Sequence, residues 1–182
     1  DLACVPLVFV GGAAVGLMIG SDPRKPETIK SDFDLDAQLE AKIIDTYKER
    51  AHVNVHAFND MVLLTGEVPD EATRAGVELL ARGMPNVRDV YNKTVVAGAS
   101  SLGDRLNDST LTSKVKARMV QANLFSPNHV KVVSERGQVF LLGLVTQDEG
   151  AAAARIASET AGVLKVHTLF EYLDPKTGMV SP

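Results

Sequence analysis

The sequence contains one segment twice, and this repeat is the strongest limit on what the chain can fold into. Residues 53–68 read VNVHAFNDMVLLTGEV and residues 130–145 read VKVVSERGQVFLLGLV, which align without a gap at a shift of 77. Solenoids are built from shorter and more numerous units of about 20–50 residues, so this period predicts two small domains. What the copies share should specify the fold, and their differences are the better guide to function.

Length and composition fit two small globular domains. The chain has 182 residues, of which 45% are hydrophobic and 23% charged. Its formal net charge of −4 argues against a general nucleic-acid binder, because such proteins carry a basic surface. Cys4 is the single cysteine, which excludes an intramolecular disulfide and a cysteine-based zinc site.

Cys4 opens an apolar stretch, residues 5–20, that has no charge before Asp22. This stretch is short for a transmembrane helix, which needs about 20 residues. One interpretation is the end of a signal peptide's apolar core. The other, which we favour, is the mature start of a lipoprotein with its lipid on Cys4, because Leu2 and Ala3 match the end of the cleavage motif. Asp1 departs from that motif.

Hydrophobic periodicity predicts the same order of elements, helix–strand–strand–helix–strand, in each copy. The first copy is expected to have a helix from Asp32 or Asp34, strands at 53–58 and 61–65 ended by Gly66, a helix from Asp70 and a strand at 87–96. The second is expected to have a helix from Asp108 or Ser109, strands at 130–134 and 139–142, a helix at 151–160 and a strand at 163–172. Asn59-Asp60 and Arg136-Gly137 are the expected two-residue hairpin turns.

This order predicts an α+β fold in which two helices cover one face of a three-stranded sheet. The polar residues 21–33 and the Gly/Ser-rich residues 97–108 are expected to be extended segments. The predicted organisation is an N-terminus and tether at 1–33, domains at 34–96 and 109–173, a linker at 97–108 and a C-terminal tail at 174–182. Gly66 and Gly143 are interpreted as structural, needed for a positive φ or a close backbone approach.

Several motifs in this order resemble the BON-domain family. They are V-x-L-x-G-x-V at 62–68 and 139–145, an alanine-rich helix, and V-x-x-V at 87–90 and 163–166. Asp22-Pro23-Arg24 and Asn107-Asp108 are similar to dual-BON-domain lipoproteins. The resemblance implies two tandem αββαβ domains with mixed sheets and a lipid anchor on the periplasmic face of the Gram-negative outer membrane. It also implies anionic phospholipid binding through the second domain and a role in envelope integrity and cell division.

The two copies differ in charge. Residues 34–96 contain 7 lysines and arginines against 11 acids, whereas residues 109–173 contain 7 against 5. The first helix of the second copy holds Lys114, Lys116 and Arg118, and residues 109–125 contain no acid. Lys114 and Arg118 are one helical turn apart and share a side of the helix.

This basic helix has two interpretations: a solvated surface, or an interfacial helix that faces anionic headgroups. The family resemblance implies a large aromatic residue near the start of this helix, where this sequence has Thr110. That lipid contact is then either missing or supplied by neighbours such as Leu111 or Phe125. The predicted lipid-facing set is therefore Lys114, Lys116, Arg118, Leu111, Val120, Leu124 and Phe125.

The sequence offers no catalytic motif. Its four histidines are scattered, and it contains no Ser-His-acid order, HExxH or phosphate-binding GK[ST]. We therefore expect neither an enzyme nor a metal or cofactor site. The rival hypothesis is a protein-interaction scaffold or a homo-oligomeric ring that contacts envelope assembly or division proteins.

Overall fold

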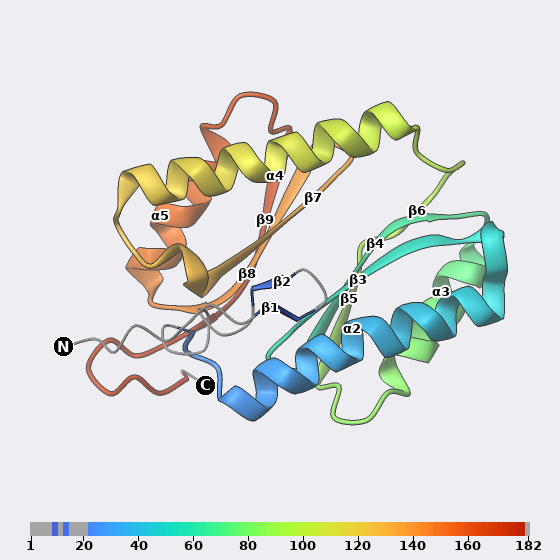
Figure 1. Cartoon of the computed structure of the whole chain (residues 1–182), viewed down its shortest axis with the longest axis horizontal. Coiled ribbons are helices and arrows are strands. Elements are labelled where there is room, and N and C mark those ends of the chain that lie inside the picture. The colour runs from blue at the N-terminus through green and yellow to red at the C-terminus, as the bar shows by residue number, and fades with distance from the viewer. Residues whose placement is uncertain (1–8, 11–12, 15–21, 181–182) are drawn as a thin grey trace. The chain divides into compact units, whose positions relative to one another are not determined.

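The computed structural model describes residues 9–10, 13–14 and 22–180. Strands β1 (Phe9–Val10) and β2 (Ala13–Ala14) pair antiparallel, and Cys4 lies outside the described residues. The rest of the chain forms two compact units, Pro26–Arg105 and the residues from Leu106 onward, called here the first and second domains (Figure 1). Among the helices of the described ranges, none is both long and apolar enough to span a bilayer.

The first domain has two helices and a mixed sheet. Helix α2 (Pro26–Tyr47) leads through a 3₁₀ turn, η1 (Lys48–Arg50), into the antiparallel hairpin of β3 (His52–Phe58) and β4 (Met61–Val68). Helix α3 (Glu71–Arg82) then crosses to β5 (Asp89–Asn92) and β6 (Val95–Val96), which both pair parallel with β4.

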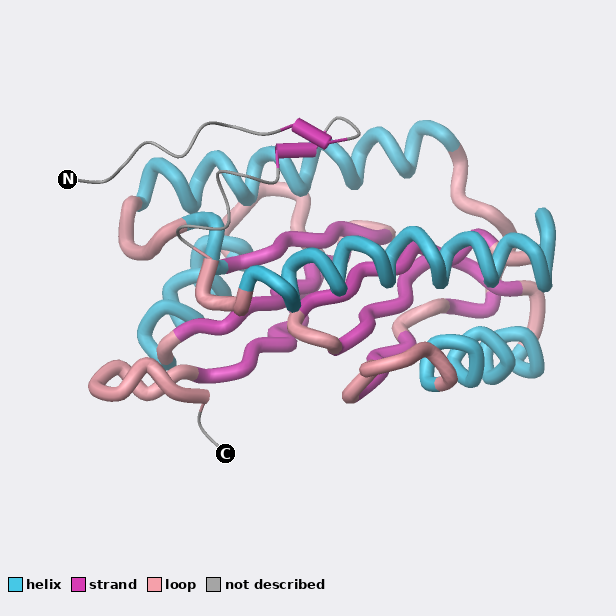
Figure 2. Tube along the Cα trace, turned by 60° about the horizontal axis from the view of Figure 1, so that its bottom comes forward, coloured by secondary structure: helices cyan, strands magenta, loops and turns pink. Residues whose placement is uncertain are grey.

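The second domain repeats this topology. Helix α4 (Leu102–Ala122), whose first turn belongs to the first unit, is followed by η2 (Pro127–His129) and the hairpin of β7 (Val130–Glu135) and β8 (Gln138–Val145). Helix α5 (Gln147–Ser158) leads to β9 (Lys165–Tyr172), which runs parallel to β8. Figure 2 shows the alternation of helices and strands along the trace. The predicted fold class, two αββαβ units with mixed sheets, is confirmed.

Each domain packs its helices on one face of its sheet around an aliphatic core. Helix α2 contributes Leu35, Leu39 and Ile43 to the first core. Helix α4 contributes residues at the same spacing to the second core, each shifted by 76 positions: Leu111, Val115 and Met119. Burial of apolar surface against the sheet stabilises each fold by roughly 25 cal/mol per Å².

The hairpin turns and the repeated glycines are as predicted. Asn59 and Asp60 have φ values of 52° and 65°, and Arg136 and Gly137 have 53° and 76°, which is the type I′ geometry of two-residue hairpins. Gly66 has a φ of 111°, and a Cβ there would overlap the carbonyl oxygen of His52. At Gly143 a Cβ would overlap the carbonyl oxygen of His129. Both glycines therefore allow the backbone just before or at the start of the neighbouring strand to approach closely.

Two segments predicted to be extended are partly helical, which corrects the expected tether and linker. Helix α2 begins at Pro26 rather than at Asp32 or Asp34, because proline is tolerated in the first turn, where its missing N–H has no helical acceptor. Helix α4 begins at Leu102 rather than near Asp108. Ser101 and Asp104 cap it, since each accepts a backbone N–H from the other.

Some strand and helix boundaries also differ from the prediction. Strands β4 and β8 continue past their glycines to Val68 and Val145, because the parallel neighbours extend the pairing. The third strand of the first domain is divided into β5 and β6, and β9 begins at Lys165 rather than Val163. Helix α5 begins at Gln147, four residues early, because Thr146 and Glu149 form a capping box.

Candidate functional site

The outward face of α4 is the candidate site. Because an α-helix turns about 100° per residue, the burial of Leu111, Val115 and Met119 directs the opposite face outward. That face carries Leu106 and Val120, whose exposed fractions are 59% and 60%. Leu106 and Val120 are two separate exposed apolar side chains on a helix side that also carries the exposed residues Ser113 and Ala117.

Lysines flank the outward side of α4 on both sides. Lys114 and Lys116 are exposed, and their spacing of two residues places them about 200° apart around the helix. Leu124, just beyond the end of α4, is 56% exposed. No acid occurs in residues 109–125, so this part of the helix combines positive charge with exposed apolar side chains.

Arg118 does not belong to the exposed face. Its side chain is partly buried, and Nη1 donates to Thr160 Oγ1 at 3.2 Å. Its Nη2 also lies 4.0 Å from Glu159 Oε2. The guanidinium therefore connects α4 to the end of α5, and its charge is partly balanced within the domain.

The prediction was wrong for two apolar members of the lipid-facing set. Leu111 and Phe125 are 3% and 8% exposed and belong to the second core, so they cannot face a membrane in this fold. Thr110 is exposed, and its hydroxyl donates to the Leu106 carbonyl. Leu106 itself was missed, because the helix was expected to start after it.

In the first domain, the acids of the corresponding helix are used to hold the sheet. Three carboxylates, one turn apart along α2, accept backbone N–H groups from the edge strand β3 and its turn. Glu40 Oε1 accepts from Val55 N at 3.2 Å, and Asp36 accepts from Ala57 N. Asp32 accepts from Asn59 N and Asp60 N. These side chains are structural and do not form an anionic ligand site.

The second domain keeps one of these three carboxylates. Buried Asp108 accepts from Arg136 N at 2.8 Å and from Gly137 N at 2.9 Å, in the same way that Asp32 holds the first turn. The next turn of α4 presents Thr112, whose hydroxyl bonds the Ser134 hydroxyl at 2.7 Å. The domains thus share a fold but differ in the side chains that their first helices place against the edge strand. These are three carboxylates in α2, and one carboxylate and a threonine in α4.

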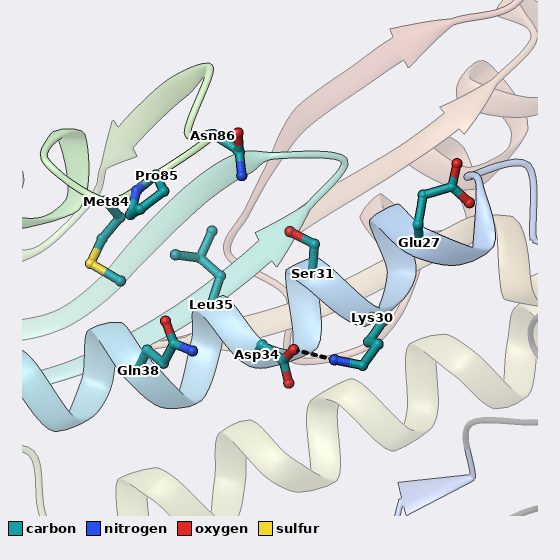
Figure 3. A pocket seen from close by; sticks show the side chains of 9 residues that line it. All are labelled: Glu27, Lys30, Ser31, Asp34, Leu35, Gln38, Met84, Pro85 and Asn86. Carbon is teal, nitrogen blue, oxygen red and sulfur yellow. Dashed lines mark hydrogen bonds and ion pairs between the residues drawn. The ribbon is translucent and has the colours of Figure 1, made fainter.

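A hollow of about 260 Å³ lies in the first domain, between α2 and the turn after α3 (Figure 3). Lys30 Nζ donates to Asp34 Oδ2 at 2.8 Å on the exposed surface of α2, and this hydrogen bond and charge raise the pKa of the Lys30 ammonium. The two charges neutralise each other, and no nucleophile with a partnered base lines the hollow. Its lining residues are Glu27, Lys30, Ser31, Asp34, Leu35, Gln38, Met84, Pro85 and Asn86.

Two histidines of the second domain make local contacts. His167 Nε2 lies 2.7 Å from Gln138 Oε1, and its ring stacks on Phe140 at a centroid distance of 4.5 Å. His129 Nδ1 lies 3.5 Å from Glu149 Oε2. Within the described ranges, no three His, Cys, Asp or Glu side chains converge in a way that could hold a metal ion.

Comparison with known proteins identifies the family of both domains. The BON domain family matches residues 31–98 and again residues 107–174. The chain belongs to the BON-domain family. Each BON match begins within the first helix of its unit and reaches to or beyond the last strand. The repeat is therefore a tandem pair of BON domains.

Three curated BON-type relatives span most of the chain. The sequence is 39% identical over 94% of its length to "Outer membrane lipoprotein DolP" of Haemophilus influenzae, of which it covers 89%. It is 31% identical over 81% of its length to a "21 kDa hemolysin" of Actinobacillus pleuropneumoniae, covering 72% of that protein. It is 27% identical over 84% of its length to "Osmotically-inducible protein Y" of Escherichia coli, covering 78%.

Proposed function

We propose that this protein is a non-enzymatic lipoprotein of the Gram-negative outer membrane that binds anionic phospholipid through its second BON domain. Cys4 carries the lipid anchor, and the protein faces the periplasm. Its cellular role is to support envelope integrity and cell division. The observation that carries the binding proposal is the outward face of α4, where Leu106 and Val120 are flanked by Lys114 and Lys116.

The chemistry of this face fits an interfacial helix, in which apolar side chains enter the headgroup region and cations meet anionic lipid. Each lysine near such a surface contributes about 1 kcal/mol, so the two together contribute roughly 2 kcal/mol. That affinity is weak for a free protein. A lipid anchor would raise the effective concentration of the face at the membrane, which makes a weak contact sufficient.

The proposed location is supported by similarity and by one sequence motif. The Haemophilus relative is named an outer membrane lipoprotein and aligns with 94% of the chain. Leu2, Ala3 and Cys4 fit the end of a lipoprotein cleavage motif.

The binding proposal is tested with vesicles of phosphatidylglycerol and, for comparison, phosphatidylcholine. The double variant Lys114→Glu/Lys116→Glu should bind phosphatidylglycerol vesicles at least about 30-fold more weakly, because roughly 2 kcal/mol of attraction is lost. The matched control is Lys42→Glu/Lys93→Glu, which makes the same charge change at exposed lysines of the first domain. Equal binding by the two variants would contradict the proposal.

A further inference from the structure

The two domains provide an internal comparison at the edges of their sheets. Strands β3 and β7 correspond at a shift of 77, which places Val55 on Val132 and Ala57 on Ser134. Helices α2 and α4 correspond at a shift of 76, which is fixed by the buried pairs and by the turn-binding acids Asp32 and Asp108. By this alignment the positions of Asp36 and Glu40 are taken by Thr112 and Lys116.

The edge of β7 lacks the acceptors that the edge of β3 has. Strand β7 is the outer strand in the order β7-β8-β9, and its two-residue turn pairs Glu135 with Gln138. This register directs the N–H groups of Val132 and Ser134 away from β8, as it does for Val55 and Ala57 in the first domain. Among the described residues, no acceptor outside the β7–β8 ladder bonds either N–H.

Lys116 stands where the acceptor for Val132 would be expected. In the first domain, Glu40 at this helix position reaches the N–H of Val55. One turn earlier, Thr112 bonds Ser134 of β7, which shows that this side of α4 faces the strand; Figure 1 shows both elements in the second domain. A cation has therefore replaced an internal carboxylate beside an N–H group that points outward.

We infer that Lys116 and the N–H of Val132 form a subsite for an external oxyanion, which occupies the place of the Glu40 carboxylate in the first domain. A phosphate oxygen would accept the N–H and lie beside the ammonium, an arrangement of charge-assisted hydrogen bonds. The inference rests on the proposed function, for which it supplies a site for the phosphodiester of an anionic phospholipid. Free phosphate has the same chemistry.

The position of Lys116 suits this role. Around α4 it lies between Thr112, which contacts β7, and Val120, which is exposed, because successive residues turn by about 100°. A headgroup phosphate bound there would leave its acyl chains next to Val120. Lys114 lies on the opposite flank of the helix.

The test is an amide NMR titration of the full chain with sodium phosphate at constant ionic strength and, separately, with dihexanoyl-phosphatidylglycerol. The Val132 amide resonance should shift with both probes. Lys116→Glu should abolish both shifts and slow exchange of the Val132 amide about fivefold, the effect of one ordinary net hydrogen bond. Lys165→Glu makes the same charge change at an exposed residue of β9, at the other edge of this sheet, and should leave the phosphate-induced shift of Val132 intact.

Different outcomes separate this inference from the proposed function. If phosphatidylglycerol vesicles bind but Val132 responds to neither probe, the subsite is wrong and lipid binding stands. If Val132 responds to phosphate but vesicles do not bind, the oxyanion subsite stands and the proposed function fails. If Val132 instead becomes protected with rising protein concentration in the absence of phosphate, its edge pairs with a second copy, and the inference is overturned.

Discussion

At the scale of single residues, the most informative side chains are the buried carboxylates that hold the hairpin turns. The type I′ turn of the second domain requires a positive φ at Arg136, which is an unfavourable conformation for a residue with a side chain. Asp108 compensates by accepting the N–H groups of both turn residues. A charged acceptor makes such hydrogen bonds stronger than neutral ones, so Asp108 stabilises a conformation that the turn residues alone would disfavour.

Removing this carboxylate should destabilise the second domain. Asp108→Ala should lower the free energy of unfolding by about 2–3 kcal/mol, because two turn N–H groups lose a charged acceptor. Urea denaturation followed by circular dichroism measures this change. Ser109→Ala, at the exposed neighbouring position, should stay within about 0.5 kcal/mol of the parent. Identical stability of the two variants would show that water replaces the carboxylate at no cost.

The sequence predicted which residues lie on one helix side better than it predicted where that side points. Its spacing correctly relates Lys114 to Arg118, yet the fold turns Arg118 toward Thr160 and leaves Lys114 exposed. Leu111 and Phe125 were predicted to face the membrane as nearby apolar residues that could replace the aromatic contact expected at Thr110, whereas packing in the second core buries them. Tertiary packing determines which side of a helix points outward. The hydrophobic periodicity of one sequence does not carry this information.

At the scale of elements, the start of a helix was predictable where a side chain caps it. Asp70 was predicted to start α3, and its carboxylate does accept the Thr73 N–H at 2.7 Å. The starts of α2 and α4 were missed, because Pro26 and the Ser/Gly-rich residues before Leu102 are also typical of loops. In both cases packing and capping decide between two conformations that the local sequence allows.

The cap at Asp70 gives α3 a pH-dependent contribution to stability. The hydrogen bond from the Thr73 backbone lowers the pKa of Asp70 below its ordinary value of 3.8. A lowered pKa in the folded state means that the carboxylate stabilises the fold above the unfolded pKa. This contribution is lost as the pH falls through the lowered folded pKa.

Asp70→Asn keeps a side-chain acceptor for the cap but removes the charge. The parent should therefore be more stable than this variant at about pH 6, and the difference should shrink towards about pH 3. Urea denaturation at both pH values measures the two differences. A difference that does not change with pH would show that the charge of Asp70 contributes nothing to the cap.

At the scale of the whole molecule, a duplicated fold carries two distributions of charge. The core pattern recurs so regularly that the tandem αββαβ architecture could be predicted from sequence alone. The roles of the charges could not, because they depend on the register between a helix and its edge strand. Asp36 and Glu40 of α2 are bonded to β3, whereas the lysines of α4 are exposed. The first helix therefore holds the edge strand with carboxylates in one domain and carries exposed cations in the other.

This division of charge predicts how salt affects the complete protein on phosphatidylglycerol vesicles. Raising NaCl from about 0.1 M to about 1 M shortens the Debye length from about 10 Å to about 3 Å, so vesicle binding should weaken steeply. Lys114→Glu/Lys116→Glu should bind weakly at both concentrations, because the charges that salt screens are reversed. The control Lys42→Glu/Lys93→Glu should keep the salt dependence of the parent. If the parent binds equally well in high and low salt, the apolar residues Leu106 and Val120 carry the contact, and the lysines do not.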